Sequence, residues 1–121
     1  VVHARDGLDE ISIAAETNVA ELKDGVVSSY TLSPAEAGAT MDSLESLKVS
    51  SAEDSLRMIE SVLDGQAGPA LGIVALNAGA AVYTSGLASD LNDGVARARE
   101  AIASGAAKQA LSMLVATSKE D

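Results

Sequence analysis

The sequence predicts a portion of an α/β domain, which consists of one buried strand, a β-hairpin, and then three to four helices. An apolar run at Val1–Ala4 stops at charged residues and a glycine, which is typical of a buried strand that leads into a loop. An Asp24-Gly25 pair stands between two runs rich in Val, Thr and Tyr. From residue 51 the apolar residues recur at helical spacing. These patterns place the strand and hairpin at about residues 1–33 and the helical part at about 51–117 of one domain segment covering 1–121.

The hairpin is predicted from its turn. Asn18–Leu22 and Val26–Leu32 flank Lys23-Asp24-Gly25, and the glycine supplies the positive φ that a tight hairpin turn needs. Pro34 ends the second strand because proline has no N–H to donate to a ladder. Residues 35–49 are predicted to be irregular, with at most a short helical turn.

The first two helices are predicted from capping residues and an apolar stripe. Ser51 can cap the first helix, with Asp54 as its capping-box partner, and Asp64-Gly65 ends it. Gly68-Pro69 opens the second helix, since proline suits the first turn. Residues 71–83 are apolar almost all round, so we expect this helix to be central and covered on most sides. The stripe of the first helix consists of Ala52, Leu56, Ile59 and Leu63.

The last two helices follow the same logic. Ser89 or Asp90 caps the third helix, and Ser104-Gly105 ends it, because glycine readily takes the left-handed conformation of a C-cap. A fourth helix is predicted over about 106–116, and the polar tail Thr117–Asp121 is expected to fray. The apolar contacts expected are Leu91, Val95, Ala98 and Ile102 for the third helix and Leu111, Leu114 and Val115 for the fourth.

The strand content indicates a segment of a larger domain. Val1–Ala4 is apolar at consecutive positions, which favours burial on both faces of a parallel sheet. One such strand and a hairpin make a poor sheet by themselves, so we expect the partners of Val1–Ala4 to lie outside this chain. A segment of an α/β domain explains this better than a complete α+β domain does.

Composition and charge narrow the function classes. The apolar residues make up 47% of the 121 residues but include no Phe or Trp, so the core must be built from small side chains and closely packed helices. With a net charge of −10, the chain lacks the clustered basic residues that bind nucleic acids or anionic membranes. The acidity itself indicates no particular function, because it is also common on soluble proteins. The lack of cysteine excludes disulfides, thiolate metal sites and a cysteine nucleophile, and it fits a cytoplasmic protein without a visible targeting segment.

Asp9 and Glu10 are the candidate metal ligands. They belong to the densest acidic cluster, residues 6–10, which follows the C-terminal end of the first predicted strand, where open α/β sheets bind ligands. Adjacent carboxylates offer the hard oxygen ligands that Mg²⁺ prefers. A solvated loop whose acids face water explains the same spacing, and spacing alone leaves both interpretations open. A calcium-binding loop is excluded because its spacing of carboxylates is absent.

His3 and Asn77 are the other polar residues of interest. His3 is the only histidine and has no evident orienting carboxylate or metal partner, so we expect a half-buried side chain bonded to backbone. Asn77 is the one amide in the most apolar helix. It must satisfy both its carbonyl and its NH₂, which favours a bond from helix to loop or sheet over a substrate contact. The sequence contains no Gly-x-Ser-x-Gly, Gly-x-Gly-x-x-Gly or Walker motif.

Several blocks, taken together and in order, resemble the anthranilate phosphoribosyltransferases. Val1-Val2-His3-x-x-Asp6-Gly7-Leu8-Asp9-Glu10-Ile11-Ser12 resembles the late metal-site motif of that family, and Leu76–Tyr83 is similar to its Asn-Ala-(Gly/Ala)-Ala-Ala-Leu-Tyr helix. Weaker matches cover the hairpin with the loop after it, and the penultimate helix with the turn that follows it. The departures are Ala4 where the family often has Gly, Glu16 where Pro often precedes Thr17, and Val49-Ser50-Ser51 in place of Gly-Gly-Asp.

The resemblance implies the C-terminal portion of a phosphoribosyltransferase α/β domain. The parent enzyme would join anthranilate to phosphoribosyl pyrophosphate, releasing pyrophosphate, in tryptophan biosynthesis, and would be a cytoplasmic homodimer. Carried over by position, Asp9 and Glu10 would be the acidic pair that organises one Mg²⁺. The segments that bind both substrates are absent here, so this chain alone is expected to be inactive. The alternatives are a non-catalytic helical module for packing or assembly and a pyrimidine nucleoside phosphorylase-like enzyme of the same superfold.

Overall fold

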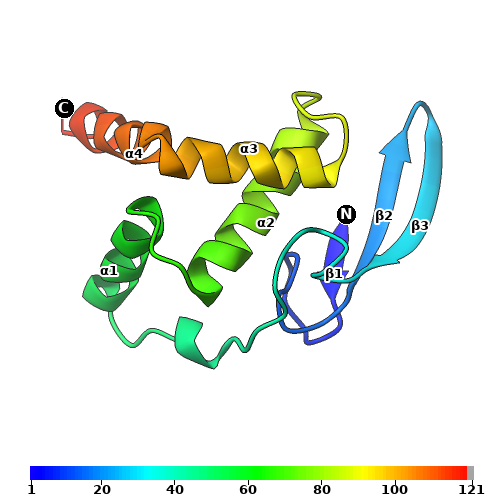
Figure 1. The fold of residues 1–121 in the computed structure, drawn as a ribbon, viewed down its shortest axis with the longest axis horizontal. Coiled ribbons are helices and arrows are strands. Elements are labelled where there is room, and N and C mark those ends of the chain that lie inside the picture. The colour runs from blue at the N-terminus through cyan, green and yellow to red at the C-terminus, as the bar shows by residue number, and fades with distance from the viewer. Residues whose placement is uncertain (120–121) are drawn as a thin grey trace.

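The computed structural model describes residues 1–119 and contains a three-stranded sheet followed by helices (Figure 1). The hairpin lies at one end of the molecule, α1 and α4 lie at the other, and α2 connects the two ends (Figure 1). No helix among the described residues has the length and apolar character needed to cross a membrane. The expected fraying of the tail falls partly on residues 120–121, which lie outside the described range. The elements are β1 (Val2–Ala4), β2 (Thr17–Lys23), β3 (Val26–Leu32), the 3₁₀ turn η1 (Glu45–Leu47), α1 (Ala52–Leu63), α2 (Pro69–Thr84), α3 (Leu91–Ala103) and α4 (Ala106–Thr117).

The sheet is antiparallel throughout, with the strand order β1-β2-β3. The expectation that Val1–Ala4 finds its partners outside this chain is wrong for one edge, because Val2 pairs with Val19 and Ala4 with Thr17. The expected burial on both faces is also wrong, since only Ala4 is fully buried and the neighbouring His3 is exposed. A run of four residues carries too little pattern to specify its partner, and the loop after β1 returns β2 alongside it.

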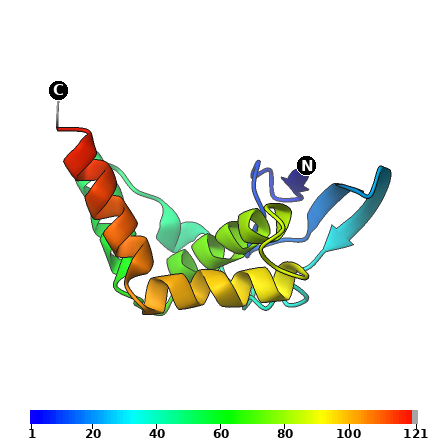
Figure 2. The same ribbon diagram turned by 90° about the horizontal axis from the view of Figure 1, so that it is seen from above.

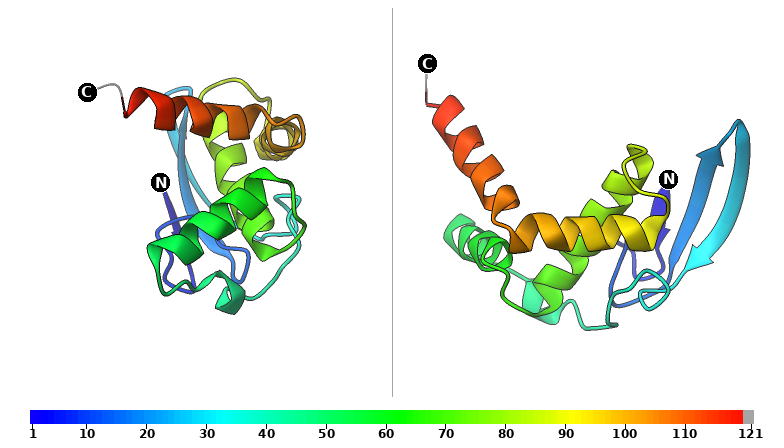
Figure 3. Two further views of the ribbon diagram at one scale, coloured as in Figure 1. Left: turned by 90° about the vertical axis from the view of Figure 1, so that its left-hand side faces the viewer. Right: turned by 45° about the horizontal axis from the view of Figure 1, so that its top comes forward.

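The hairpin turn forms as predicted. Asp24 and Gly25 both have positive φ, 51° and 78°, as the primed turns that match strand twist require. The two strands pair from Thr17↔Leu32 to Lys23↔Val26 without a bulge. The hairpin extends away from the helices (Figure 3), and its tip leaves Leu22, Val26 and Val27 exposed.

The helices begin and end at the predicted capping residues. Ser51 Oγ accepts a hydrogen bond from the Asp54 N–H at 3.0 Å, and Asp90 Oδ1 accepts one from the Asp93 N–H at 2.8 Å. The capping box at α1 is only half formed, because the Asp54 carboxylate accepts its bond from the Ser50 hydroxyl. Gly105 has a φ of 80° and connects α3 to α4, which confirms the predicted left-handed conformation at the end of α3.

The core lies where α2, α3 and the N-terminal loop meet (Figure 2). Two glycines let the helices approach closely: a Cβ built on Gly94 would lie 2.2 Å from the carbonyl oxygen of Gly79. The predicted stripe of α3 faces this contact, with Val95, Ala98 and Ile102 buried. The remaining core residues come from α2 and the loops and include Ile11, Ile13, Ala37, Ala39, Ala75 and Leu76.

The apolar faces of α1 and α4 are only partly covered by the described residues. Leu56 and Ile59 of the predicted α1 stripe are 51% and 46% exposed, and Leu114 of α4 is 66% exposed. The expected apolar contact at Leu114 of α4 is therefore wrong within residues 1–119, because that side chain is mostly exposed. Val62 is the buried residue of α1, and Lys108 at the start of α4 forms an ion pair with Asp64. Leu63 of α1 and Leu111 of α4 are half-buried, so the described residues cover only part of each stripe.

Candidate metal site

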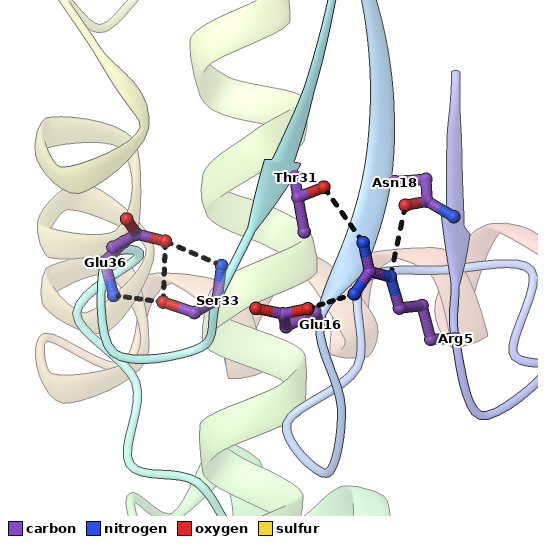
Figure 4. A network of polar contacts seen from close by, with 6 residues as sticks. All are labelled: Arg5, Glu16, Asn18, Thr31, Ser33 and Glu36. Carbon is purple, nitrogen blue, oxygen red and sulfur yellow. Dashed lines mark hydrogen bonds and ion pairs between the residues drawn. The ribbon is translucent and has the colours of Figure 1, made fainter.

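The candidate site lies on the loop between β1 and β2, residues 5–16. The loop leaves the C-terminal end of β1 and is closed at its base, where the Arg5 N–H donates to the Glu16 carbonyl at 2.8 Å. The Arg5 guanidinium adds an ion pair with the Glu16 carboxylate and reaches Asn18 Oδ1 and Thr31 Oγ1 at 3.4 and 3.3 Å (Figure 4). Glu16 thus helps to close the loop through both its backbone carbonyl and its carboxylate.

The first half of the loop is braced by Asp6. Its Oδ1 accepts from the Leu8 N–H at 3.2 Å, and its Oδ2 accepts from the Ser12 hydroxyl at 2.5 Å. Gly7, at φ 100°, completes the turn by donating its N–H to the Ala4 carbonyl at 3.0 Å. Asp6 therefore shapes the loop from within, although it belongs to the same acidic cluster as Asp9 and Glu10.

The second half of the loop is part of the core. Ile11, Ser12 and Ile13 are all buried, and the two isoleucines pack against α2 and α3. The Ser12 N–H donates to Thr17 Oγ1 at 3.3 Å, and the Ile13 carbonyl accepts from the Asp42 N–H at 3.0 Å. This burial was not predicted from the sequence, where only the alternation Ile11-Ser12-Ile13 hints at it.

Asn77 bonds α2 to this loop, as the helix-to-loop interpretation predicted. Its Oδ1 accepts from the Ile11 N–H at 2.9 Å, and its Nδ2 donates to the Ile11 carbonyl, also at 2.9 Å. The same Nδ2 donates to the Ile73 carbonyl, one turn earlier in α2, at 3.0 Å. Asn77 therefore forms hydrogen bonds with both the backbone N–H and the carbonyl of Ile11.

Asp9 and Glu10 lie between these two braced halves and face solvent. Within residues 1–119 neither side chain forms an ion pair or a hydrogen bond, so both carboxylates can bind a cation. The same described range contains no group of three His, Cys, Asp or Glu side chains that could hold a metal by itself. The pair therefore fits Mg²⁺ as two hard oxygen ligands, with other ligands supplied from elsewhere.

His3 does not match its expected environment. Its side chain is exposed on β1, at the position paired with Asn18, and within the described residues it makes no hydrogen bond to backbone. The prediction of a half-buried histidine is wrong because β1 presents this position to solvent. Nothing brings His3 into the site.

A second polar cluster, not predicted from the sequence, joins the hairpin to α2. The Tyr83 hydroxyl donates to Glu21 Oε1 at 2.6 Å, and the Tyr30 hydroxyl donates to Oε2 at 3.1 Å. The bond from Tyr83 is the largest cause that lowers the pKa of Glu21; desolvation opposes it, and the bond from Tyr30 lowers the pKa further. Lys23 Nζ donates to the Tyr83 hydroxyl at 3.1 Å, which raises the pKa of Lys23. The cluster borders a hollow of about 540 Å³ between the hairpin and α2.

Glu36 fixes the chain where β3 ends. Its carboxylate accepts from the Ser33 N–H at 2.9 Å and from the Ser33 hydroxyl at 2.6 Å (Figure 4). These bonds lower the pKa of Glu36. The contact lies apart from the Arg5 network and turns the chain toward the segment that leads to η1.

Comparison with known proteins identifies relatives over nearly the whole chain. The anthranilate phosphoribosyltransferase of Stenotrophomonas maltophilia is 51% identical over 119 residues, which is 98% of this chain and 35% of the relative. The enzyme of that name from Saccharophagus degradans is 54% identical, covering 95% of this chain and 35% of its own length. The chain thus spans about a third of the length of the curated relatives it matches.

Solved structures share the fold. The crystal structure of anthranilate phosphoribosyltransferase from Thermus thermophilus superimposes with a TM-score of 0.85 at 39% identity, over 96% of this chain and 34% of that one. The Saccharomyces cerevisiae enzyme in complex with PRPP and Mg has a TM-score of 0.80 at 24% identity, over 92% of this chain and 32% of that one. The expected α/β fold, present as a portion of a larger domain, is confirmed.

Residues 1–108 match the family model that is described as "Glycosyl transferase family, a/b domain". That match covers the sheet, the loop with Asp9 and Glu10, and the helices through the start of α4. Together with the relatives that match the chain from end to end, it leads to one conclusion: the chain belongs to the glycosyl transferase family, as part of its a/b domain.

Proposed function

We propose that this chain is the C-terminal segment of an anthranilate phosphoribosyltransferase. That enzyme transfers phosphoribose from phosphoribosyl pyrophosphate to anthranilate and releases pyrophosphate in tryptophan biosynthesis. The relatives of that name, at 51% and 54% identity over almost the whole chain, support the proposal. The full-length protein is proposed to be a cytoplasmic homodimer whose other segments hold most of both substrates, so this segment alone is inactive.

One observation carries the role of this segment. Asp9 and Glu10 are exposed and free of partners within residues 1–119, while the loop on either side of them is held by hydrogen bonds and by the core. An acidic pair that served only solubility would not need a loop braced on both sides. The backbone that carries the two carboxylates is held in a fixed place, which favours a metal-binding role.

The pair would hold Mg²⁺ together with oxygen atoms of the diphosphate and water. When bound, Mg²⁺ neutralises the charge that develops on the leaving diphosphate. Asp9 and Glu10 would contribute two negative charges that keep the cation at the loop, and the hydrogen bonds around them limit how far the backbone that carries them moves. The yeast enzyme of this fold was solved with PRPP and Mg, which supports a magnesium site in the family.

The test uses the full-length protein that carries this segment. Asp9→Asn and Glu10→Gln keep the size of each side chain and remove its charge. We expect each to raise the Mg²⁺ concentration needed for half-maximal anthranilate consumption by about tenfold or more. Glu53→Gln is the matched control, because Glu53 is an exposed acid on α1 without a side-chain partner in the described range.

Two results would count against the proposal. If the full-length wild-type protein did not consume anthranilate in the presence of phosphoribosyl pyrophosphate and Mg²⁺, the assigned activity would be wrong. If Asp9→Asn and Glu10→Gln behaved like Glu53→Gln while the wild type was active, the activity would stand and the metal ligands would lie elsewhere.

A further inference from the structure

We propose that Asn77 is a positioning residue for the Asp9-Glu10 pair: its amide holds the peptide group that joins Glu10 to Ile11. This inference rests on the proposed function, because it concerns the same metal-binding loop. Asn77 contacts neither carboxylate. It acts through the backbone that carries them.

The geometry links the amide directly to Glu10. The N–H that Asn77 Oδ1 accepts belongs to the Glu10–Ile11 peptide, so it lies one peptide bond from the Cα of Glu10. The second bond, from Nδ2 to the Ile11 carbonyl, holds the next peptide group. Two bonds of 2.9 Å from one planar amide fix the rotation of this stretch as well as its position.

The amide is itself held in place. Its bond to the Ile73 carbonyl fixes the side chain against its own helix, so the side chain cannot swing away from the loop. Asn77 is itself half-buried, and Ile11, the residue that it bonds, is 3% exposed, so the loss of these bonds would leave polar groups with restricted access to water. The position of the loop is thus tied to that of α2.

Burial of Ile11 alone would not achieve the same result. Apolar contacts hold a side chain in the core but are not directional, so they leave the rotation of the preceding peptide open. An asparagine in a helix that is otherwise almost wholly apolar introduces polar groups that must be satisfied. Its two bonds to a single residue are the directional restraint that the isoleucine lacks. The Asp6–Ser12 bond provides a comparable restraint on the other side of the pair.

Two variants of the full-length protein test the inference. Asn77→Asp keeps the shape and the acceptor for the Ile11 N–H but removes the donor to the Ile11 carbonyl. Asn77→Leu removes all three bonds of the amide and keeps the branched shape of the side chain. The control is Asn92→Asp, which makes the same change of charge at an exposed position of α3 where the structure shows no side-chain hydrogen bond within the described residues.

The expected result for Asn77→Asp is a weaker metal site in a folded protein. The Mg²⁺ concentration for half-maximal activity rises about tenfold, as for other residues that orient metal ligands, while KM for anthranilate stays unchanged. Binding of Mn²⁺ in the presence of phosphoribosyl pyrophosphate, followed by electron paramagnetic resonance, weakens by the same factor. Amide hydrogen exchange of the peptide covering residues 8–13 becomes faster, whereas the control changes none of these values.

Other outcomes would overturn the inference. If Asn77→Asp and Asn77→Leu lowered the melting temperature but bound Mn²⁺ like the wild type, Asn77 would serve packing alone. The Mn²⁺ comparison stands even if the wild-type protein proved inactive with anthranilate, which would refute the proposed function and not the role of Asn77. If Asn77→Leu failed to fold, Asn77→Asp would still decide the question.

Discussion

Gly79 offers the sharpest test of how α2 and α3 pack. A Cβ built on Gly79 would lie 2.6 Å from the Cα, N and Cγ2 atoms of Val95. Two of these three atoms are backbone, so a change of the Val95 rotamer cannot relieve the overlap. Gly79→Ala must therefore push the two helices apart along their closest approach.

The magnitude follows from two opposing effects. Alanine in place of glycine in a helix interior stabilises by about 0.5–1 kcal/mol, because the unfolded chain has less freedom to lose. Overpacking of a tight core costs about 1–3 kcal/mol, and contact with backbone belongs to the upper end of that range. The net expectation for Gly79→Ala is a loss of about 2 kcal/mol.

Gly72 is the matched control on the same helix. A Cβ there would meet only Ile13 Cγ2, at an ordinary contact distance of 3.9 Å. Gly72→Ala should therefore stabilise by about 0.5–1 kcal/mol, which separates the two variants by about 3 kcal/mol. Urea unfolding of the full-length protein, monitored by circular dichroism, measures both. Equal midpoints for Gly79→Ala and Gly72→Ala would refute the close approach of the helices.

Three further predictions concern the hairpin and the helix caps. Tyr83→Phe removes the hydrogen bond that lowers the pKa of Glu21. The stabilisation from this bond is fully present above the unfolded pKa of 4.5 and is lost as the pH falls through the lowered pKa of the folded state. The melting temperatures of wild type and variant should therefore converge in acid, and a difference that does not depend on pH would contradict this. Asp90→Ala removes the N-cap of α3 and should lower the free energy of unfolding in urea by about 1 kcal/mol. An unchanged midpoint would show that the cap does not stabilise the fold. Gly25→Val places a β-branched residue at φ 78° and should cost about 1–2 kcal/mol; faster amide exchange in β2 and β3 would report it, and unaltered exchange would speak against the turn geometry.

Features encoded by neighbouring residues were predictable from the sequence. The boundaries of α1 and α3 follow from Ser51 and Asp90, whose side chains cap the first turn as their residue types predict. The hairpin follows from Asp24-Gly25, because few other residue pairs accept two positive φ values in succession. In each case the cause and the structure lie within a few residues of each other.

Features that depend on distant residues were not predictable in the same way. The antiparallel partner of β1 is β2, which the loop brings back from residue 17, and a three-residue strand contains no signal for that choice. The sequence predicted that Asn77 bonds a loop or a sheet, but the partner, Ile11, lies 66 residues away. The apolar stripes of α1 and α4 predicted helices correctly and said nothing about what covers them.

The closed loop of residues 5–16 has a consequence for the thermodynamics of ligand binding. Ordering a flexible residue costs about 1–2 kcal/mol in conformational entropy. If a loop became ordered only when its ligand bound, this cost for every ordered residue would weaken binding. Here the ion pair at Arg5 and Glu16, the buried Ile11 and the amide of Asn77 fix the loop during folding. A cation that bound at Asp9 and Glu10, as proposed, would therefore meet a preformed loop, and the entropy of its binding would be governed by the release of water from the ion and the carboxylates.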